Sequence, residues 1–182
     1  MNKIKEFFRA YGGVIGKIII NHIAMSIFGL MVCFPTAKSP VLFWGASILA
    51  IGMYMFLLYM IMWELGAKES VEVEYGRMKR DNFKGLKISL VTNSLFILIS
   101  ILIFILSFFE TSEASGLNSF MYVLVWIMEL FVESMYLPIV ASCSNFTLIF
   151  LLLIIPELVC CALSYWAGVS GKKCLFPDKK KK

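Results

Sequence analysis

The sequence predicts an all-α protein that crosses a lipid bilayer several times, and three observations predict this class. Of the 182 residues, 60% are hydrophobic and only 16% are charged, whereas soluble domains carry about 25% charged residues. The mean hydropathy is +0.84, so a soluble globule would expose too much apolar surface to water. The apolar residues also gather in runs of about 20, the length of helix that crosses a hydrocarbon core. Because no linker divides these runs, we expect residues 1–182 to form a single integral membrane domain.

Apolar segments lie at residues 13–35, 40–63, 88–109, 119–141 and 146–169. We expect each to be a helix, because a helix satisfies its backbone N–H and C=O groups within lipid. Before the first segment, aromatic and aliphatic residues recur at helical spacing among charged ones in residues 1–11. That pattern predicts a short amphipathic helix at the membrane interface. The predicted architecture is a polytopic transmembrane helix bundle with about five membrane-embedded helices and this short interfacial one.

Basic residues flank the apolar segments, and no Lys or Arg occurs between residues 88 and 171. A nucleic-acid-binding protein would instead carry basic residues on a folded face, so that class is excluded. Residues 64–87 hold six basic and five acidic residues and form the predicted cytoplasmic loop. Alternation of polar and apolar residues predicts a short extended piece at 70–75, which Gly76 ends. Residues 170–182 form a basic tail.

The positive-inside rule leaves two topologies open. If all five segments cross, the N-terminus is cytoplasmic and ten basic residues share its side, against seven on the other side. If segment 119–141 enters and returns, the division becomes sixteen against one. We predict five helices and a cytoplasmic N-terminus, with the side of the C-terminal tail left open.

Ionisable side chains inside the predicted helices are the candidates for function: His22, Glu129, Glu133 and Glu157. An ionised carboxylate at membrane depth costs at least ~2.5 kcal/mol. Glu129 and Glu133 are four residues apart and would share one face of an α-helix, so we expect at least one of them to be protonated. Three roles are open for these acids. They are neutral and hydrogen-bonded to neighbouring helices, they bind a proton or cation that moves, or they meet a cationic group on a partner protein or ligand.

Two further features bear on the same acids. Pro156 removes a helical hydrogen bond to the carbonyl of Leu152 and predicts a kink beside Glu157, either for packing or as in the broken helices of transporter sites. His22 is expected to be hydrogen-bonded to a neighbouring helix, with a proton relay to a glutamate as the alternative.

Nothing in the sequence indicates catalysis, a metal or a cofactor. It contains no H-E-x-x-H, no G-x-S-x-G and no P-loop, so an enzyme is not the favoured class. A single histidine and five cysteines without a C-x-x-C indicate neither a metal site nor a redox site.

One stretch resembles a known group of proteins. Trp63-Glu64-Leu65-Gly66-Ala67-Lys68, then Gly76-Arg77-Met78-Lys79, then Lys84-Gly85-Leu86 through Asn93, is similar to a loop in small multi-pass membrane proteins of Clostridium-like Gram-positive bacteria. The resemblance covers residues 63–93. It implies a bacterial cytoplasmic membrane and supplies no activity or site.

These observations favour a transport-related protein, either a small permease or the membrane subunit of a larger transporter. Five helices are few for a complete carrier, so a homo-oligomer or a partner membrane or ATPase subunit is implied, beside the lipid bilayer itself. The alternative is a non-catalytic interaction or regulatory protein that docks a partner through the 64–87 loop. Arg77, Lys79 and Arg80 are the docking candidates, and binding to anionic lipid headgroups is their simpler role.

Overall fold

The computed structural model describes residues 3–108, 115–143 and 146–171, and every regular element in these ranges is helical. The helices run in the order α1 (Lys3–Thr36), α2 (Pro40–Glu74), α3 (Lys84–Thr92), α4 (Ser94–Ser107), α5 (Ser115–Ile127), the π-helix η1 (Met128–Val132), the 3₁₀ helix η2 (Ser134–Tyr136), α6 (Leu137–Ser142) and α7 (Phe146–Val169). The predicted all-α class is confirmed.

Local sequence explains where the longest helix, α2, begins and ends. Pro40 occupies the first turn of α2, where its missing N–H is not needed. At the other end, Gly76 adopts a left-handed φ of 70°. Its N–H donates to the Val73 carbonyl, and the Arg77 N–H donates to the Glu72 carbonyl. This is a Schellman motif, which satisfies the last carbonyls of the helix.

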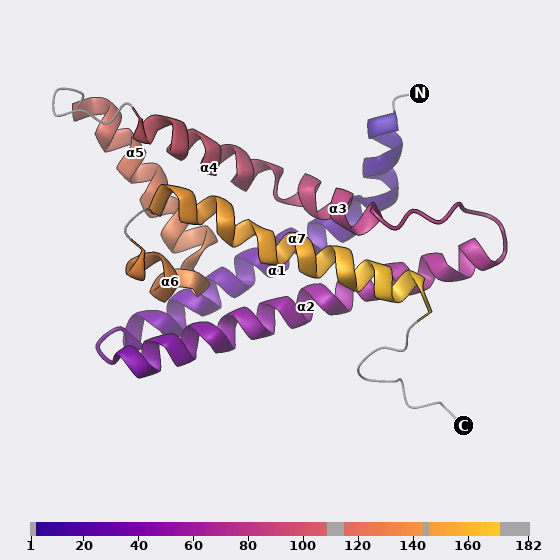
Figure 1. The fold of residues 1–182 in the computed structure, drawn as a ribbon, viewed down its shortest axis with the longest axis horizontal. Coiled ribbons are helices and arrows are strands. Elements are labelled where there is room, and N and C mark those ends of the chain that lie inside the picture. Colours follow the sequence, from indigo (N-terminus) through magenta and orange to yellow (C-terminus); the bar gives the residue numbers. More distant parts are fainter. Residues whose placement is uncertain (1–2, 109–114, 144–145, 172–182) are drawn as a thin grey trace.

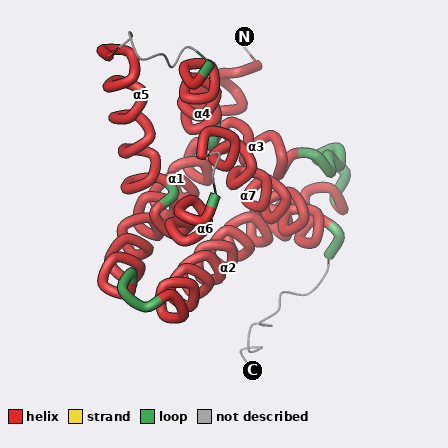
Figure 2. The backbone as a smooth tube through the Cα atoms, turned by 60° about the vertical axis from the view of Figure 1, so that its left-hand side comes forward, coloured by secondary structure: helices red, strands yellow, loops and turns green. Residues whose placement is uncertain are grey.

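The long helices run between two ends of the molecule (Figure 1). We call one the basic end, where α1 and α3 begin and α2 and α7 finish, and the opposite one the distal end. The Tyr11 hydroxyl donates to Glu69 over 2.9 Å, and Arg80 donates to the Ser170 hydroxyl over 2.8 Å. These bonds place the start of α1 and the finish of α2 and α7 side by side. Figure 2 shows α4 and α5 on one side of the bundle, away from α2.

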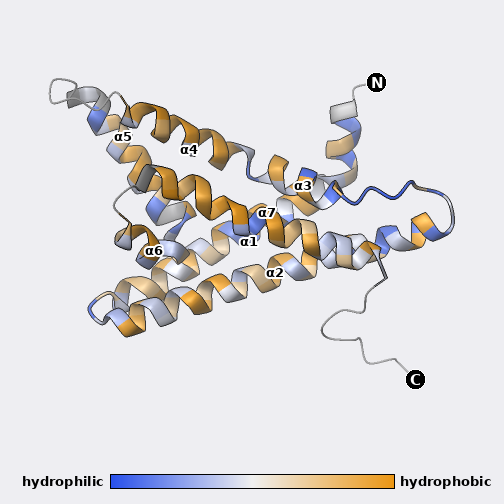
Figure 3. Cartoon of the chain, in the orientation of Figure 1, coloured by the Kyte–Doolittle hydropathy of each residue, from blue (hydrophilic) through white to orange (hydrophobic). Residues whose placement is uncertain are grey.

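Three helices are long and apolar enough to cross a membrane: Lys5–Thr36, Pro40–Glu74 and Leu148–Val169. A fourth crossing is complete if α3 and α4 count as one span, although they are bent by 59° at Asn93. Figure 3 shows that α4 and α7 are hydrophobic along most of their length and that the connection between α2 and α3 is hydrophilic. The described chain is therefore consistent with a helical membrane bundle of three to four spans, and the predicted count of five is not confirmed.

The expected single helix over 119–141 is wrong. The chain there passes from α5 through η1 and η2 into α6, and Glu133 breaks the regular geometry with φ −110° and ψ 18°. Pro138 has no N–H to donate, which is compatible with its place in the first turn of the new helix α6. This broken stretch lies in the distal half of the bundle (Figure 1).

Two other boundaries also differ from the sequence prediction. The chain over Lys3–Thr36 is one helix, rather than an interfacial helix followed by a span, although its first turns bend away from the rest (Figure 1). Helix α2 extends to Glu74, so the extended piece at 70–75 is wrong and only residues 75–83 connect α2 to α3. The Schellman motif at Gly76 ends α2 only after this alternating stretch.

Glycines allow three helices to pack closely near the basic end. A Cβ on Gly66 would meet the backbone of α7 at Tyr165, Gly168 and Val169. One on Gly85 of α3 would lie 2.7 Å from the Cys161 carbonyl oxygen. Within lipid the hydrophobic effect does not drive helices together, and small residues at such crossings allow the close van der Waals packing that stabilises their association.

Candidate functional site

The buried face of α1 carries the histidine into the centre of the bundle. Ile18, His22, Met25 and Ser26 are buried in succession, whereas Ile23 and Ile27 are exposed. This spacing of three to four residues is the helical repeat, so one face of α1 packs inward and the other meets lipid. His22 is only 4% exposed.

Polar groups from three other elements face the His22 imidazole. Its Nε2 lies 3.1 Å from the Val132 carbonyl oxygen, which can only accept, so Nε2 carries a proton and donates. Its Nδ1 lies 2.8 Å from the Tyr54 hydroxyl of α2 and 3.6 Å from Oε2 of Glu157. A neutral imidazole accepts from Tyr54 at Nδ1, and a protonated one donates from Nδ1 toward Glu157. The geometry therefore serves both charge states.

Glu157 faces His22 from the middle of α7 and is 4% exposed. The Asn93 side-chain amide donates to its Oε1 over 2.7 Å, and the same amide donates to the Ser89 carbonyl over 3.1 Å. Asn93 stands between α3 and α4, where the two are bent. Its neighbour Phe96 stacks on the His22 ring with centroids 5.0 Å apart. The bend in the α3–α4 pair is thus in direct contact with both members of the His22–Glu157 pair.

Glu133 enters the same region because the helix around it is broken. Its N–H donates to the Met128 carbonyl over 2.7 Å, a five-residue π-type bond. The side chain is 3% exposed, and its Oε2 has no hydrogen-bond partner within the described ranges. The Tyr136 hydroxyl is similarly buried and unpartnered there, and it interacts electrostatically with the carboxyls of Glu133 and Glu157. Unsatisfied buried polar atoms are rare in native structures and call for an explanation.

The break also frees backbone carbonyls, which hydroxyl groups satisfy. Ser26 donates to the Val132 carbonyl over 2.8 Å, and Ser47 donates to the Met135 carbonyl over 2.6 Å. Ser134 donates in return to the Ser26 carbonyl. Irregular backbone at membrane depth is tolerated where protein surrounds it in this way. We call the group formed by His22, Tyr54, Asn93, Glu133, Tyr136 and Glu157 the central polar cluster.

Glu129 does not join this cluster. Glu133 follows the π-helix Met128–Val132 with non-helical backbone angles and is buried, whereas Glu129 lies within that helix. The two therefore do not share a face of a regular α-helix as expected. Glu129 is half-buried and lines a hollow of about 490 Å³ on the outside of α5. Pro156 is exposed on α7, which continues as one helix from Phe146 to Val169. The kink at that proline stays a prediction.

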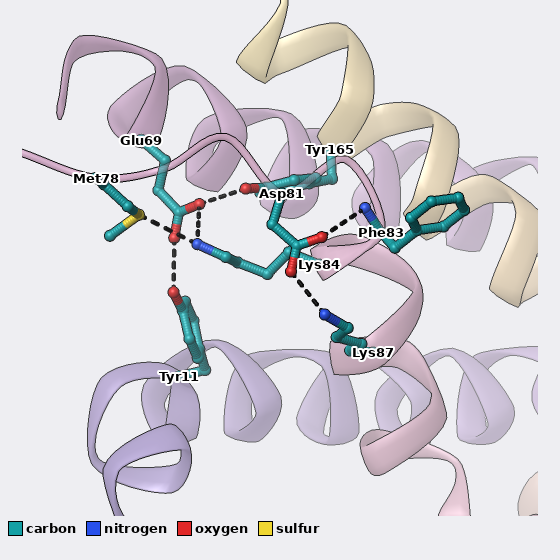
Figure 4. A network of polar contacts seen from close by, with 8 residues as sticks. All are labelled: Tyr11, Glu69, Met78, Asp81, Phe83, Lys84, Lys87 and Tyr165. Carbon is teal, nitrogen blue, oxygen red and sulfur yellow. Dashed lines mark hydrogen bonds and ion pairs between the residues drawn. The ribbon is translucent and has the colours of Figure 1, made fainter. Parts of the chain in front are cut away.

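A second polar group, the Glu69 cluster, lies at the basic end (Figure 4). It comprises Tyr11, Glu69, Lys84 and Tyr165. Lys84 donates to the Glu69 carboxylate over 2.8 Å, and both tyrosines donate to the same carboxylate. Four helices (α1, α2, α3 and α7) therefore meet at one buried acid. We interpret this cluster as structural, because each oxygen of that carboxylate has a donor.

The candidate docking residues Arg77, Lys79 and Arg80 are all exposed beyond α2. Arg80 is held by Ser170 and by Asn82, the latter over 2.8 Å. Arg77 lies over the Tyr75 ring, 5.7 Å from its centroid. Nearby, a hydrogen bond from Lys87 holds the pKa of the Asp81 carboxyl below its usual value. Asp81 also accepts the Phe83 N–H over 3.0 Å and so fixes the entry into α3.

Sequence reasoning missed the partners of the charged residues. Asn93 was detectable, as a strongly polar residue inside the apolar segment 88–109. Tyr54 was not, since tyrosine is common in apolar helices. The Glu69 cluster was assigned to a solvated loop because its acid lies beyond the apolar part of α2.

No group of three His, Cys, Asp or Glu side chains that could hold a metal ion is found in the part of the chain that the structure describes. The sequence matches no family model, no curated protein and no solved structure. What the site does must therefore be argued from its own geometry.

Proposed function

We propose that this chain is a transport-related membrane protein, a small permease or the membrane subunit of a larger transporter, and that the central polar cluster takes up and releases a proton during transport. One observation carries the proposal. Buried Glu157 lies 3.6 Å from His22. Glu133 is also buried, interacts electrostatically with the same imidazole, and has one carboxyl oxygen without a described partner.

Charge counting explains why such a cluster exchanges protons. With both acids ionised, a protonated His22 balances one negative charge and leaves the other unbalanced. An unbalanced carboxylate at membrane depth costs at least ~2.5 kcal/mol, and one added proton removes this cost. A proton on Glu133 would also turn an orphaned acceptor into a donor, with the Tyr136 hydroxyl among the groups that interact with it.

The broken helix beside the acids supports a transport role. In several secondary transporters, interrupted helices bring freed backbone groups and an ion site together near the bilayer midplane. Here the break at Glu133 lies within hydrogen-bonding reach of His22 through the Val132 carbonyl. The two share a broken helix next to buried ionisable groups, and this shared arrangement supports a transport role for the cluster over a purely structural one.

The placement of the helix ends supports one orientation in the membrane. The chain enters α1 and leaves α7 at the same end of the molecule, where Arg80 contacts Ser170. Ten of the eleven described basic residues belong to segments at this end, and only Lys38 belongs to the distal turn. The positive-inside rule then places the basic end in the cytoplasm of a bacterial cell, with segment 119–141 entering from the distal side and returning. Four crossings are few for a complete carrier, so a second copy or an ATPase subunit is part of the proposal.

A second candidate function is docking of a cytoplasmic partner by the basic end. The observation that favours it is the exposure of Arg77 and Lys79 on the 75–83 connection. Reversing the charge of both residues is expected to abolish co-purification of such a partner while leaving the fold intact. Unchanged co-purification, or a protein that purifies alone, would remove this candidate.

Solute-dependent proton flux tests the main proposal. Purified protein in liposomes that contain a pH-sensitive dye is challenged with candidate solutes under an imposed pH gradient. The wild type is expected to show proton flux that depends on one solute class. Glu133→Gln and Glu157→Gln are expected to abolish this flux, whereas Glu64→Gln, an exposed acid on α2, retains it. Equal flux in all variants would contradict the proposal.

A further inference from the structure

The outside of α5 carries a hollow that the central polar cluster does not use. Its volume is about 490 Å³, and its described lining consists of Tyr122, Val123, Val125, Trp126 and Glu129. These residues recur at spacings of three and four and so lie along one side of the helix. A second hollow of about 470 Å³ shares Trp126 and is otherwise lined by the last turns of α1, from Leu30 to Pro35. The two hollows together join α1 to α5 near the distal end.

The lining combines three kinds of recognition chemistry. Trp126 is 61% exposed and offers a large aromatic face. Glu129 contributes a carboxyl group, and no ion pair of that group is seen among the described residues. Tyr122 adds a second aromatic ring, and two valines make up the aliphatic rest of the described lining. Aromatic rings attract cations over their faces, a carboxylate adds an opposite charge, and the aliphatic wall favours a lipophilic body.

We propose that this hollow binds a lipophilic organic cation. Charge complementarity selects this occupant. An anion would meet the Glu129 carboxylate without a described cation nearby, and a neutral lipid tail would leave the acid without a counter-charge. The volume lies within the range of roughly 300–1,000 Å³ that is typical of small-molecule sites.

The position of the hollow suits such a ligand. It adjoins the final turns of α1, which places it near the distal membrane face. Amphipathic cations and the rings of Trp and Tyr both accumulate at this level of a bilayer. A ligand can therefore reach Glu129 from the lipid phase without passing the closely packed basic end.

The proximity of the two sites suggests what the ligand does. Glu129 lies in η1 and lines the hollow, whereas Glu133 directly follows η1 and belongs to the central polar cluster. Glu133 loses its negative charge when it takes up a proton, and a cation at Glu129 favours the ionised form of Glu133. Binding of the cation therefore favours release of the proton, and the reverse. The role of the cation as a substrate exchanged for a proton rests on the proposed function, whereas its binding in the hollow does not.

Binding of tetraphenylphosphonium to the purified wild-type protein in lipid nanodiscs tests the proposal. Tetraphenylborate has the same shape and the opposite charge, and empty nanodiscs give the partition into lipid alone. We expect saturable binding of the phosphonium and none of the borate. Glu129→Gln is expected to weaken phosphonium binding about tenfold or more, since a charged partner is lost. Trp126→Leu is expected to weaken it severalfold.

Matched controls separate the site from general effects. Glu64→Gln removes an exposed acid at the basic end, and Trp44→Leu removes an exposed tryptophan near the distal turn. Both are expected to bind as the wild type does. Equal binding of phosphonium and borate by the wild type, no saturable phosphonium binding, or full affinity in Glu129→Gln would each overturn the proposal.

The variants also separate this inference from the proposed function. Glu157→Gln is expected to abolish proton flux and retain phosphonium binding, whereas Glu129→Gln loses phosphonium binding and retains the proton site. Loss of binding in both variants would show that Glu129 is no separate site and would overturn the inference. Retained binding with no proton flux in the wild type would leave the hollow assigned and remove the proposed function.

Discussion

Replacement of Gly66 by alanine tests how closely α2 and α7 must pack. A Cβ at this position would lie 2.9 Å from the Val169 nitrogen and 3.1 Å from the Gly168 Cα, and it would also press on the Tyr165 carbonyl oxygen. All three are backbone atoms, so no side chain can rotate away. The two helices must therefore separate.

The size of the effect follows from that separation. Ordinary contact requires an additional half ångström or more, and a gap of this size forfeits a quarter to a half of each van der Waals contact along the crossing. The shift also pulls Tyr165 from Glu69, to which it donates. Overpacking together with a weakened charge-assisted bond costs about 2–4 kcal/mol of the free energy of unfolding.

Gly52→Ala is the matched control. Gly52 lies on the same helix, and nothing lies within 4 Å of a Cβ placed there. The added methyl group favours the helix by up to about 1 kcal/mol relative to glycine. Equilibrium unfolding in mixed micelles by denaturing detergent measures both variants. We expect Gly66→Ala to be destabilised and Gly52→Ala to be unchanged or more stable. Equal unfolding free energies for the two variants would refute the close crossing.

Three further predictions follow from the contacts. Asn93→Leu removes the donor to Glu157 and is expected to cost about 1–3 kcal/mol of unfolding free energy, while the exposed Ser94→Ala costs under about 0.5 kcal/mol; equal losses would show that the buried bond contributes nothing. Asp81 has a folded pKa below its unfolded value, so its contribution to stability is present above the unfolded pKa and is lost as pH falls through the folded pKa. Asp81→Asn should remove this pH dependence and raise hydrogen exchange at the start of α3. The effect is expected to be under about 1 kcal/mol, because the ion pair of Asp81 with Lys87 is partly exposed to water. In a variant that keeps Cys143 as its single cysteine, this residue should react with a membrane-impermeant maleimide added on one side of the membrane only. We expect that side to be opposite to the side on which tags at both chain termini are accessible. Reaction from the same side as either tag would contradict the proposed orientation.

Hydropathy predicted the helical class and the positions of the first, second and last long helices, because length and apolarity alone specify a helix in lipid. It could not predict the broken stretch after Ile127. Residues 119–141 are apolar and long enough for a span, and only the packing of Val132 against His22 and Ser26 shows why the helix is interrupted there. Helix ends beyond the apolar runs were also missed, since the contacts that Gly66 and Glu69 make with α7 leave no trace in hydropathy.

The candidate site was predicted in part. Burial of His22 and Glu157 followed from their places in apolar segments, and the structure brings both together with Glu133. Their separation from Glu129 was not predictable, because a spacing of four residues implies a common face only where the helix is regular, and the backbone is broken at Glu133. Tyr54 and Asn93 approach from distant parts of the chain, and a single sequence carries no signal for such contacts.

Infrared difference spectroscopy during a pH titration of the membrane-embedded protein tests the central claim most directly. The protonated carboxyl group has its own C=O stretching band, which reports a proton on a buried acid. The account predicts a band that appears and disappears reversibly with pH, that is lost in Glu133→Gln and Glu157→Gln, and that persists in Glu64→Gln. A wild-type spectrum without a titrating carboxyl band, or a band unchanged in both buried variants, would contradict the account.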